Sequence, residues 1–180
     1  MSRFIHMPVD RLAGCARLLL ALGVGLALSH AMFAASKLPL TTGRVLNPGE
    51  VLREVPGALL GDSYYAEVNS ASLPRLYKDF RDELFERGIM RRSDRFTCKH
   101  FAGLFAEMAQ ADFAREMHSS NSKARALAIG SIWYVRDDGA GPHAIVQALT
   151  ERGRVYLEPQ TGREISLSPR EEASAYFRFF

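Results

Sequence analysis

The stretch GPHAIVQALTERGRVYLEPQTG, residues 141–162, alternates apolar and polar side chains on both sides of a short polar turn. This alternation predicts two antiparallel strands joined as a hairpin, with one face turned toward a core. The two-residue turn uses either the first two or the last two of residues 151–153, and in both registers His143 and Glu158 project from the same face. With the earlier turn, Gln160 lies opposite His143 and Glu158 is its diagonal neighbour. The hairpin therefore predicts an imidazole with an acidic or amide side chain beside it.

Two helices are predicted before the hairpin. Residues 72–88 begin with a serine that suits a cap and a proline in the first turn, carry apolar residues at helical spacing and end at a glycine. Residues 98–117 repeat small and aromatic residues at the same spacing, with Asp94 or Thr97 as the cap. Cys98 therefore lies in the first turn of the second helix.

Strands are also predicted on both sides of the hairpin, at residues 126–137 and 163–167, with turn-type connections between them. Helices followed by an antiparallel meander form an α+β arrangement, in which N-terminal helices pack on a C-terminal antiparallel sheet. A chain of 180 residues, 47% of them apolar, can bury one ordinary core. We expect one folded domain over residues 61–180, preceded by an extended linker or wrapping segment at 35–60.

Residues 1–34 have the parts of a secretory signal peptide. Arginines precede the apolar run LLLALGVGLAL at 18–28, and small residues follow it. We expect export to the periplasm or secretion from the cell, with removal of Cys15 together with the leader. The alternative is an uncleaved leader, because the uncharged run at 18–36 is just long enough to anchor the chain in the inner membrane. In that case the N-terminal segment gives the protein its membrane association.

Cys98 is the one cysteine that is left once the leader is removed. A lone thiol in an oxidising compartment cannot form an internal disulfide, so it indicates a reactive thiol, an intermolecular disulfide or an inert buried residue. The start of a helix activates a thiol through its partial positive charge and its free backbone N–H groups. Cys98, His143 and Glu158 are thus candidates for a nucleophile, a general base and an orienting acid, with Gln160 in support.

Charge argues against a nucleic-acid partner. The formal net charge is +3, and the leader supplies two of these charges, so the rest of the chain is nearly neutral and has no basic stripe. No metal site is expected, because Cys98 and His100 point to different sides of a helix and His118 adds no standard ligand spacing. No cofactor is expected either. The segment MRRSDR at 90–95 is interpreted as a solvated turn, with attraction of an acidic substrate as an alternative.

The order Cys, His, acid, with the cysteine opening a helix and the other two residues on adjacent strands, resembles papain-like and transglutaminase-like cysteine enzymes. Residues 141–162 resemble the His-Ala and Glu-Pro-Gln hairpin of small bacterial and phage transglutaminase-like cysteine peptidase domains, and of a calcium-dependent peptidase domain attached to fungal lectins. CKHFAGLFAEMA at 98–109 resembles that family's cysteine-led helix. The resemblance implies a papain-like (transglutaminase-like) fold. The family's glutamine before the cysteine and tryptophan after it are missing, so the candidates for the second oxyanion donor are Tyr64, Tyr65 and Asn69.

The resemblance implies an exported thiol-dependent acyl-transfer enzyme, a cysteine peptidase or amidase that acts on a peptide or protein substrate. In that mechanism Cys98 forms a thioester, His143 moves the proton and Glu158 holds the imidazole. One alternative is a transglutaminase-type crosslinker. Another is a non-catalytic exported binding module on the same fold, which the missing oxyanion donor favours. A dimer linked by a disulfide through Cys98 is a further alternative.

Overall fold

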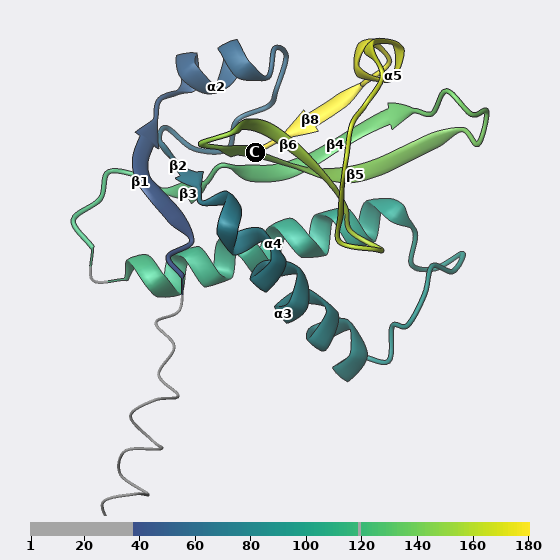
Figure 1. Ribbon diagram of the computed structural model, residues 1–180, viewed down its shortest axis with the longest axis horizontal. Helices are drawn as coiled ribbons and strands as arrows, with labels where there is room; N and C mark the ends of the chain where they lie inside the picture. The colour runs from purple at the N-terminus through teal and green to yellow at the C-terminus, as the bar shows by residue number, and fades with distance from the viewer. Residues whose placement is uncertain (1–37, 119) are drawn as a thin grey trace, which may run out of the picture. The chain divides into compact units, whose positions relative to one another are not determined.

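The computed structural model describes residues 38–118 and 120–180. The leader predicted at 1–34, with Cys15, lies outside these residues. Within the described ranges, no helix combines the length and the hydrophobicity that a membrane span needs. This part of the chain forms a sheet with helices on both of its faces (Figure 1).

One sheet contains eight strands of the described residues. They are β1 (Thr41–Leu46), β2 (Tyr65–Val68), β3 (Ala126–Leu127), β4 (Ile129–Val135), β5 (Pro142–Thr150), β6 (Gly153–Glu158), β7 (Arg163–Ile165) and β8 (Phe177–Phe179). Neighbouring strands follow the order β1-β2-β5-β4-β8, while β3 also pairs with β2 and β6 links β5 to β7. Most pairs are antiparallel, but β2 runs parallel to both β3 and β5.

This mixed sheet differs from the predicted fold class. β1 and β2 precede the two long helices in the chain, and β2 has parallel partners. The predicted α+β order, with N-terminal helices followed by a purely antiparallel C-terminal sheet, is therefore wrong. The physical reason is that β2 has only four residues and all of them are buried, so it shows none of the alternation by which a strand is recognised.

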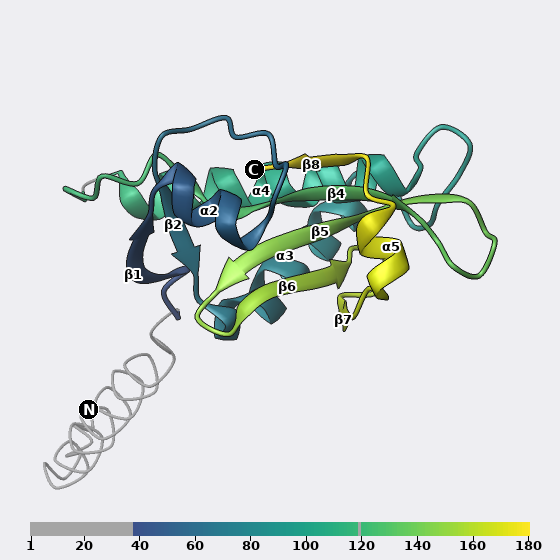
Figure 2. The ribbon, with the colours of Figure 1, turned by 90° about the horizontal axis from the view of Figure 1, so that it is seen from above.

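Helices cover both faces of the sheet. They are α2 (Pro48–Glu54), α3 (Leu73–Glu86), α4 (Cys98–Met117) and α5 (Pro169–Ala173), with a short 3-10 turn, η2, at Ser70–Ser72. α3 and α4 lie on one face, and α2 and α5 lie on the other, as both views show (Figure 1 and Figure 2). The two helices predicted from periodicity correspond to α3 and α4.

Alternation along the hairpin positions the largest core. The apolar residues of β5 and β6 that pack on the side of α3 and α4 are Ala144, Val146, Ala148, Val155 and Leu157. The predicted core face of the hairpin is thereby confirmed. Ile145 belongs instead to a separate cluster with Tyr134 and Tyr156 on the opposite face. Even-numbered residues of β5 therefore face α4, and odd-numbered residues, starting with His143, face away from it.

Residues 35–60, predicted as an extended linker or wrapping segment, contain β1 and α2. Asn47 caps α2: its side chain accepts the N–H of Glu50 at 3.1 Å, and the Glu50 carboxylate accepts the N–H of Asn47 at 2.9 Å. α2 buries Val51, and Val55, which directly follows the helix, belongs to the same buried cluster. With seven residues, this helix is too short for a periodic pattern to stand out in the sequence.

Candidate functional site

Cys98 is the first residue of α4, and only 8% of its surface is exposed. Thr97 caps this helix in an extended conformation, and its backbone N–H donates to Nδ1 of His100 at 3.0 Å. The His100 ring also stacks on Phe96. His100 therefore stabilises the start of the helix, which holds the Cys98 side chain in place.

The hairpin turn lies at residues 151–152, because Thr150 pairs with Gly153. This is the earlier of the two predicted turns, and it places Glu158 diagonally across from His143. Nε2 of His143 and Oε2 of Glu158 are 2.7 Å apart. An ionised carboxylate can only accept, so Nε2 donates in this hydrogen bond.

The second oxygen of the Glu158 carboxylate is also occupied. The backbone N–H and the side-chain amide of Gln160 donate to Oε1 of Glu158 at 3.1 and 3.3 Å. Burial by itself would raise the pKa of Glu158, but the hydrogen bonds from His143 and Gln160 outweigh it and lower the pKa. Glu158 is therefore ionised at neutral pH and fixes the orientation of the imidazole.

Cys98 and His143 border the same cleft, a cavity of about 360 Å³ at the point where α4 and β5 begin. Among the described contacts, however, no hydrogen bond joins Sγ of Cys98 to the His143 ring. Alternation along β5 explains this: α4 packs on the face of Ala144, whereas the imidazole contacts Glu158 and Tyr134 on the opposite side. The structure thus joins two of the three predicted triad residues, and leaves the thiol outside their hydrogen-bond network.

Aromatic rings form one wall of this cleft. Trp133 and Tyr176 both line it, with their ring centroids 6.4 Å apart in an edge-to-face contact. The backbone N–H of Tyr176 donates to the Trp133 carbonyl at 3.1 Å, which fixes the two residues relative to each other. The remaining lining residues are basic, polar or small, namely Arg92, Thr97, Lys99, Pro142 and Ala144.

The three predicted oxyanion donors lie elsewhere. Tyr65 is buried in β2, where its hydroxyl accepts a backbone N–H at 2.8 Å. Asn69 caps η2 by accepting a backbone N–H at 3.1 Å. Tyr64 precedes β2 and is 41% exposed. None of the three lines the cleft that contains Cys98, so the structure supplies no second oxyanion donor from this set.

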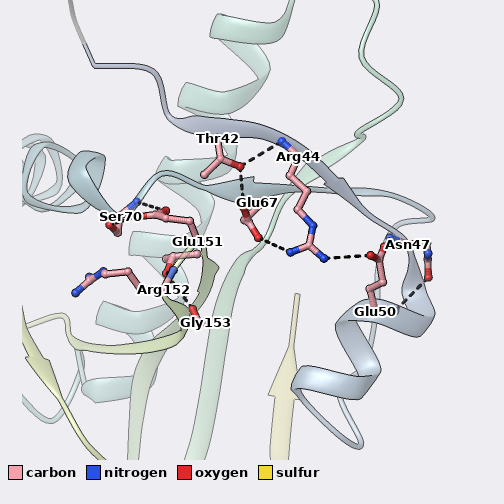
Figure 3. Close-up of polar contacts among 10 residues, drawn as sticks. Thr42, Arg44, Asn47, Glu50, Glu67, Ser70, Glu151, Arg152 and Gly153 are labelled. Atoms are coloured by element: carbon pink, nitrogen blue, oxygen red, sulfur yellow. Dashed lines mark hydrogen bonds and ion pairs between the residues drawn. The ribbon is translucent and has the colours of Figure 1, made fainter.

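A second cavity, of about 350 Å³, lies where β1, β2 and α2 meet the hairpin turn. Arg44 bridges two carboxylates there, donating to Glu67 at 3.0 Å and to Glu50 at 3.2 Å (Figure 3). The Thr42 hydroxyl also donates to Glu67, which is only 5% exposed. These polar groups satisfy one another, and none of the described residues lining this cavity is aromatic. The contacts around this cavity therefore tie α2 to β1 and β2 of the sheet.

Metal binding has no support in the described residues, since no three of their His, Cys, Asp or Glu side chains are grouped so as to hold an ion. What the cleft beside Cys98 offers is an aromatic surface, basic side chains and a fixed imidazole.

Trp133 and Tyr176 are the residues of this site that the sequence does not indicate as functional. Both belong to stretches whose aromatic composition predicts packing on the sheet, and only the pairing of β8 with β4 brings them together.

Comparison with known proteins gives a likeness of fold. No protein-family model matches the chain, and no curated protein matches it. A solved structure described as "PSL1a-E64 complex" has a TM-score of 0.54 and 20% sequence identity, covering 76% of this chain and 51% of that chain. A Polyporus squamosus lectin bound to the human-type influenza-binding epitope Neu5Aca2-6Galb1-4GlcNAc has a TM-score of 0.50 and 22% identity, covering 68% of this chain and 41% of that chain.

This chain therefore spans about half, or less, of the length of these solved structures. At such sequence identities the likeness concerns the fold alone. The ligand named for the lectin is a carbohydrate, a class of partner other than nucleic acid. The predicted peptide or protein substrate gains no support from it.

These findings correct the predicted family. The described mixed sheet matches the structure of a lectin at a TM-score of 0.50, and β1 and β2 precede the long helices instead of following them. The predicted membership of that superfamily is therefore wrong, and the cysteine peptidase or amidase activity inferred from it loses the resemblance on which it rested.

Proposed function

We propose that the protein is an exported, non-catalytic binding module that holds a saccharide in the cleft beside Cys98. The observation that carries the proposal is the make-up of this cleft, in which Trp133 and Tyr176 form an aromatic wall with polar and basic side chains around it. A sugar ring has apolar C–H faces and hydroxyl groups at its edge. An aromatic surface with polar groups around it complements both.

His143 has a binding role in this proposal. Its Nε2 is held by Glu158 at 2.7 Å, so the ring is rigid before a ligand arrives. His143 lines the cleft, and Nδ1 is the ring nitrogen for which the described contacts contain no hydrogen bond, so this nitrogen is left for a ligand hydroxyl. A preorganised polar group of this kind favours binding, since little side-chain entropy remains to be lost.

The saccharide class is supported by the fold likeness to the Polyporus squamosus lectin, which is bound to a sialylated trisaccharide. That likeness covers only 41% of the lectin chain. The proposal therefore rests on the cleft of this chain and takes from the lectin only the class of ligand.

The full chain should be tested against a panel of neutral galacto- and manno-oligosaccharides and of sialylated and uronate-containing glycans. We expect saturable binding to at least one of them. Tyr176→Ala should raise the Kd about tenfold, because it removes one aromatic surface from the ligand. Phe85→Ala is the matched control: Phe85 is 69% exposed, against 59% for Tyr176, but lies on α3 and does not line the cleft. Its Kd should equal that of the wild type.

Two results would contradict this function. One is a chain that binds no glycan of the panel while its circular dichroism shows it to be folded. The other is an equal loss of binding in Tyr176→Ala and Phe85→Ala.

Export is tested separately by cell fractionation and N-terminal sequencing. We expect a mature chain without Cys15 in the periplasm or the medium. A full-length chain in the cytoplasm would contradict export.

A further inference from the structure

The cleft beside Cys98 carries positive charge and no carboxylate. Arg92 and Lys99 line it, and no described lining residue is acidic. Both side chains are exposed. Neither is engaged in an ion pair within the described part of the chain, so their charges are not neutralised locally.

Both cations belong to the segment that joins α3 to α4 and to the first turn of α4. This segment, residues 87–99, contains four arginines and one lysine but only one acidic residue. Arg91 and Arg92 also line a smaller cavity of about 160 Å³ together with Arg81. The positive surface therefore continues from the cleft along the end of α3.

The first turn of α4 adds to this potential. α4 has 20 residues, and Cys98 and Lys99 are its first two. The first backbone N–H groups of a helix have no intrahelical acceptor, and the aligned peptide dipoles give that end a partial positive charge. An anion placed beside Lys99 is therefore stabilised by a side-chain charge and by the helix together.

Two other cavities have mixed linings in which carboxylates outnumber cations. The cavity of about 430 Å³ on the other side of His143 is lined by four carboxylate residues and two arginines. The cavity beside β1 also has more carboxylates than cations, with four glutamates and two arginines. A wholly basic charged lining is thus found in the cleft beside Cys98 and in the smaller cavity next to it, and Arg92 lines both.

We infer that the saccharide held in this cleft is acidic, and that Arg92 and Lys99 bind its carboxylate. This inference rests on the proposed saccharide-binding function and names its ligand class. A guanidinium can hold a carboxylate through two parallel hydrogen bonds, while an ammonium acts as a compact point charge. The aromatic wall then contacts the sugar ring, and the two cations discriminate acidic from neutral sugars.

The first test compares each acidic glycan of the panel with its own methyl ester, which keeps the sugar rings and removes the charge. We expect the acid to bind about tenfold more tightly than the ester at low ionic strength, and this preference to fall at high salt. The double variant Arg92→Ala/Lys99→Ala should lose the preference but keep the affinity for the ester. Arg53→Ala, which removes a cation that lines a different cavity, is the control and should keep it.

The outcomes separate the two proposals. If acid and ester bind equally, the acidic-ligand inference is overturned and the saccharide-binding function stands. If neither binds, and no other glycan of the panel binds, both are overturned.

A second measurement needs no sugar and uses Cys98 as a reporter of the potential in the cleft. Iodoacetate and iodoacetamide alkylate the same thiolate but differ in charge, so the ratio of their rates does not depend on the thiolate fraction. We expect this ratio to be several-fold higher in the folded chain than in the urea-denatured chain, and to return to the denatured value in Arg92→Ala/Lys99→Ala. A ratio equal to that of the denatured chain, or a folded thiol that reacts with neither reagent, would overturn the inference.

Discussion

Glu158 decides how the imidazole of His143 is presented. Its two carboxylate oxygens receive hydrogen bonds from His143 and from Gln160. At the scale of single residues, this network is the most sharply defined polar feature of the site. Because Glu158 is held by both partners, the charge on its carboxylate contributes to the stability of the hairpin end.

Glu158→Gln is expected to lower the free energy of unfolding by about 1–2 kcal/mol near neutral pH, because a charge-assisted hydrogen bond becomes a neutral one. The pKa of Glu158 is lowered in the folded chain, so its contribution is present above the pKa of the unfolded state and is lost as pH falls through the folded pKa. The difference between wild type and variant should therefore shrink on acidification, as measured by urea unfolding at several pH values.

Glu164→Gln is the control for this measurement. Glu164 pairs with Arg152 on the surface, where both side chains are about half exposed, so its removal should cost less than about 1 kcal/mol. An equal loss of stability in the two variants would contradict the account of Glu158, and so would a difference that does not change with pH.

At the scale of elements, β8 is held close to β4 by a glycine. A Cβ placed on Gly130 would lie 1.8 Å from the Phe179 carbonyl oxygen. Gly130→Ala should therefore force β8 away from β4 and lower the free energy of unfolding by about 3 kcal/mol. Because β8 brings Tyr176 beside Trp133, the same variant should also weaken ligand binding.

Gly103→Ala is the matched glycine substitution. Gly103 lies inside α4, and nothing is within 4 Å of the position its Cβ would take. Alanine should stabilise the helix there by about 0.5–1 kcal/mol, because glycine loses more backbone entropy on folding. Urea unfolding of both variants checks the pair. A neutral Gly130→Ala would contradict the close approach of β8 to β4.

The elements that could be predicted from sequence are those with a strong local pattern. α3, α4 and the hairpin of β5 and β6 carry long periodic runs with a cap or a turn at their ends. β2, β3 and β8 have four residues or fewer, and their partners are distant in the chain. The parallel pairing of β2 depends on those distant contacts, and local periodicity contains no information about them.

The candidate site was predictable to the same extent. Alternation along the hairpin predicts that His143 and Glu158 share a face, and the structure joins them. The same alternation places His143 on the face opposite to Ala144, which packs against α4. Whether Cys98 reaches His143 depends on how α4 is placed on the sheet, and local alternation does not give that placement. The contact between Trp133 and Tyr176 could not be predicted for the same reason, because the two residues meet only through the pairing of β8 with β4.

At the scale of the whole molecule, the net charge of the chain does not indicate the local charge of the cleft. The formal net charge of the chain is only +3, yet Arg92 and Lys99 are concentrated beside one aromatic wall. Net charge averages over the acidic and the basic cavities of the protein. Ligand class therefore depends on the local arrangement, and the proposal of an acidic saccharide rests on that arrangement.

The emission of Trp133 gives the most direct test of the central claim, that a ligand binds in the cleft beside Cys98. The chain has one tryptophan, and this residue lines the cleft, so excitation near 295 nm reports on this site alone. We expect titration with a bound glycan of the panel to change the intensity or the wavelength of this emission, and the change to saturate with the Kd measured independently. A glycan that binds the chain while the emission of Trp133 stays constant would contradict the account.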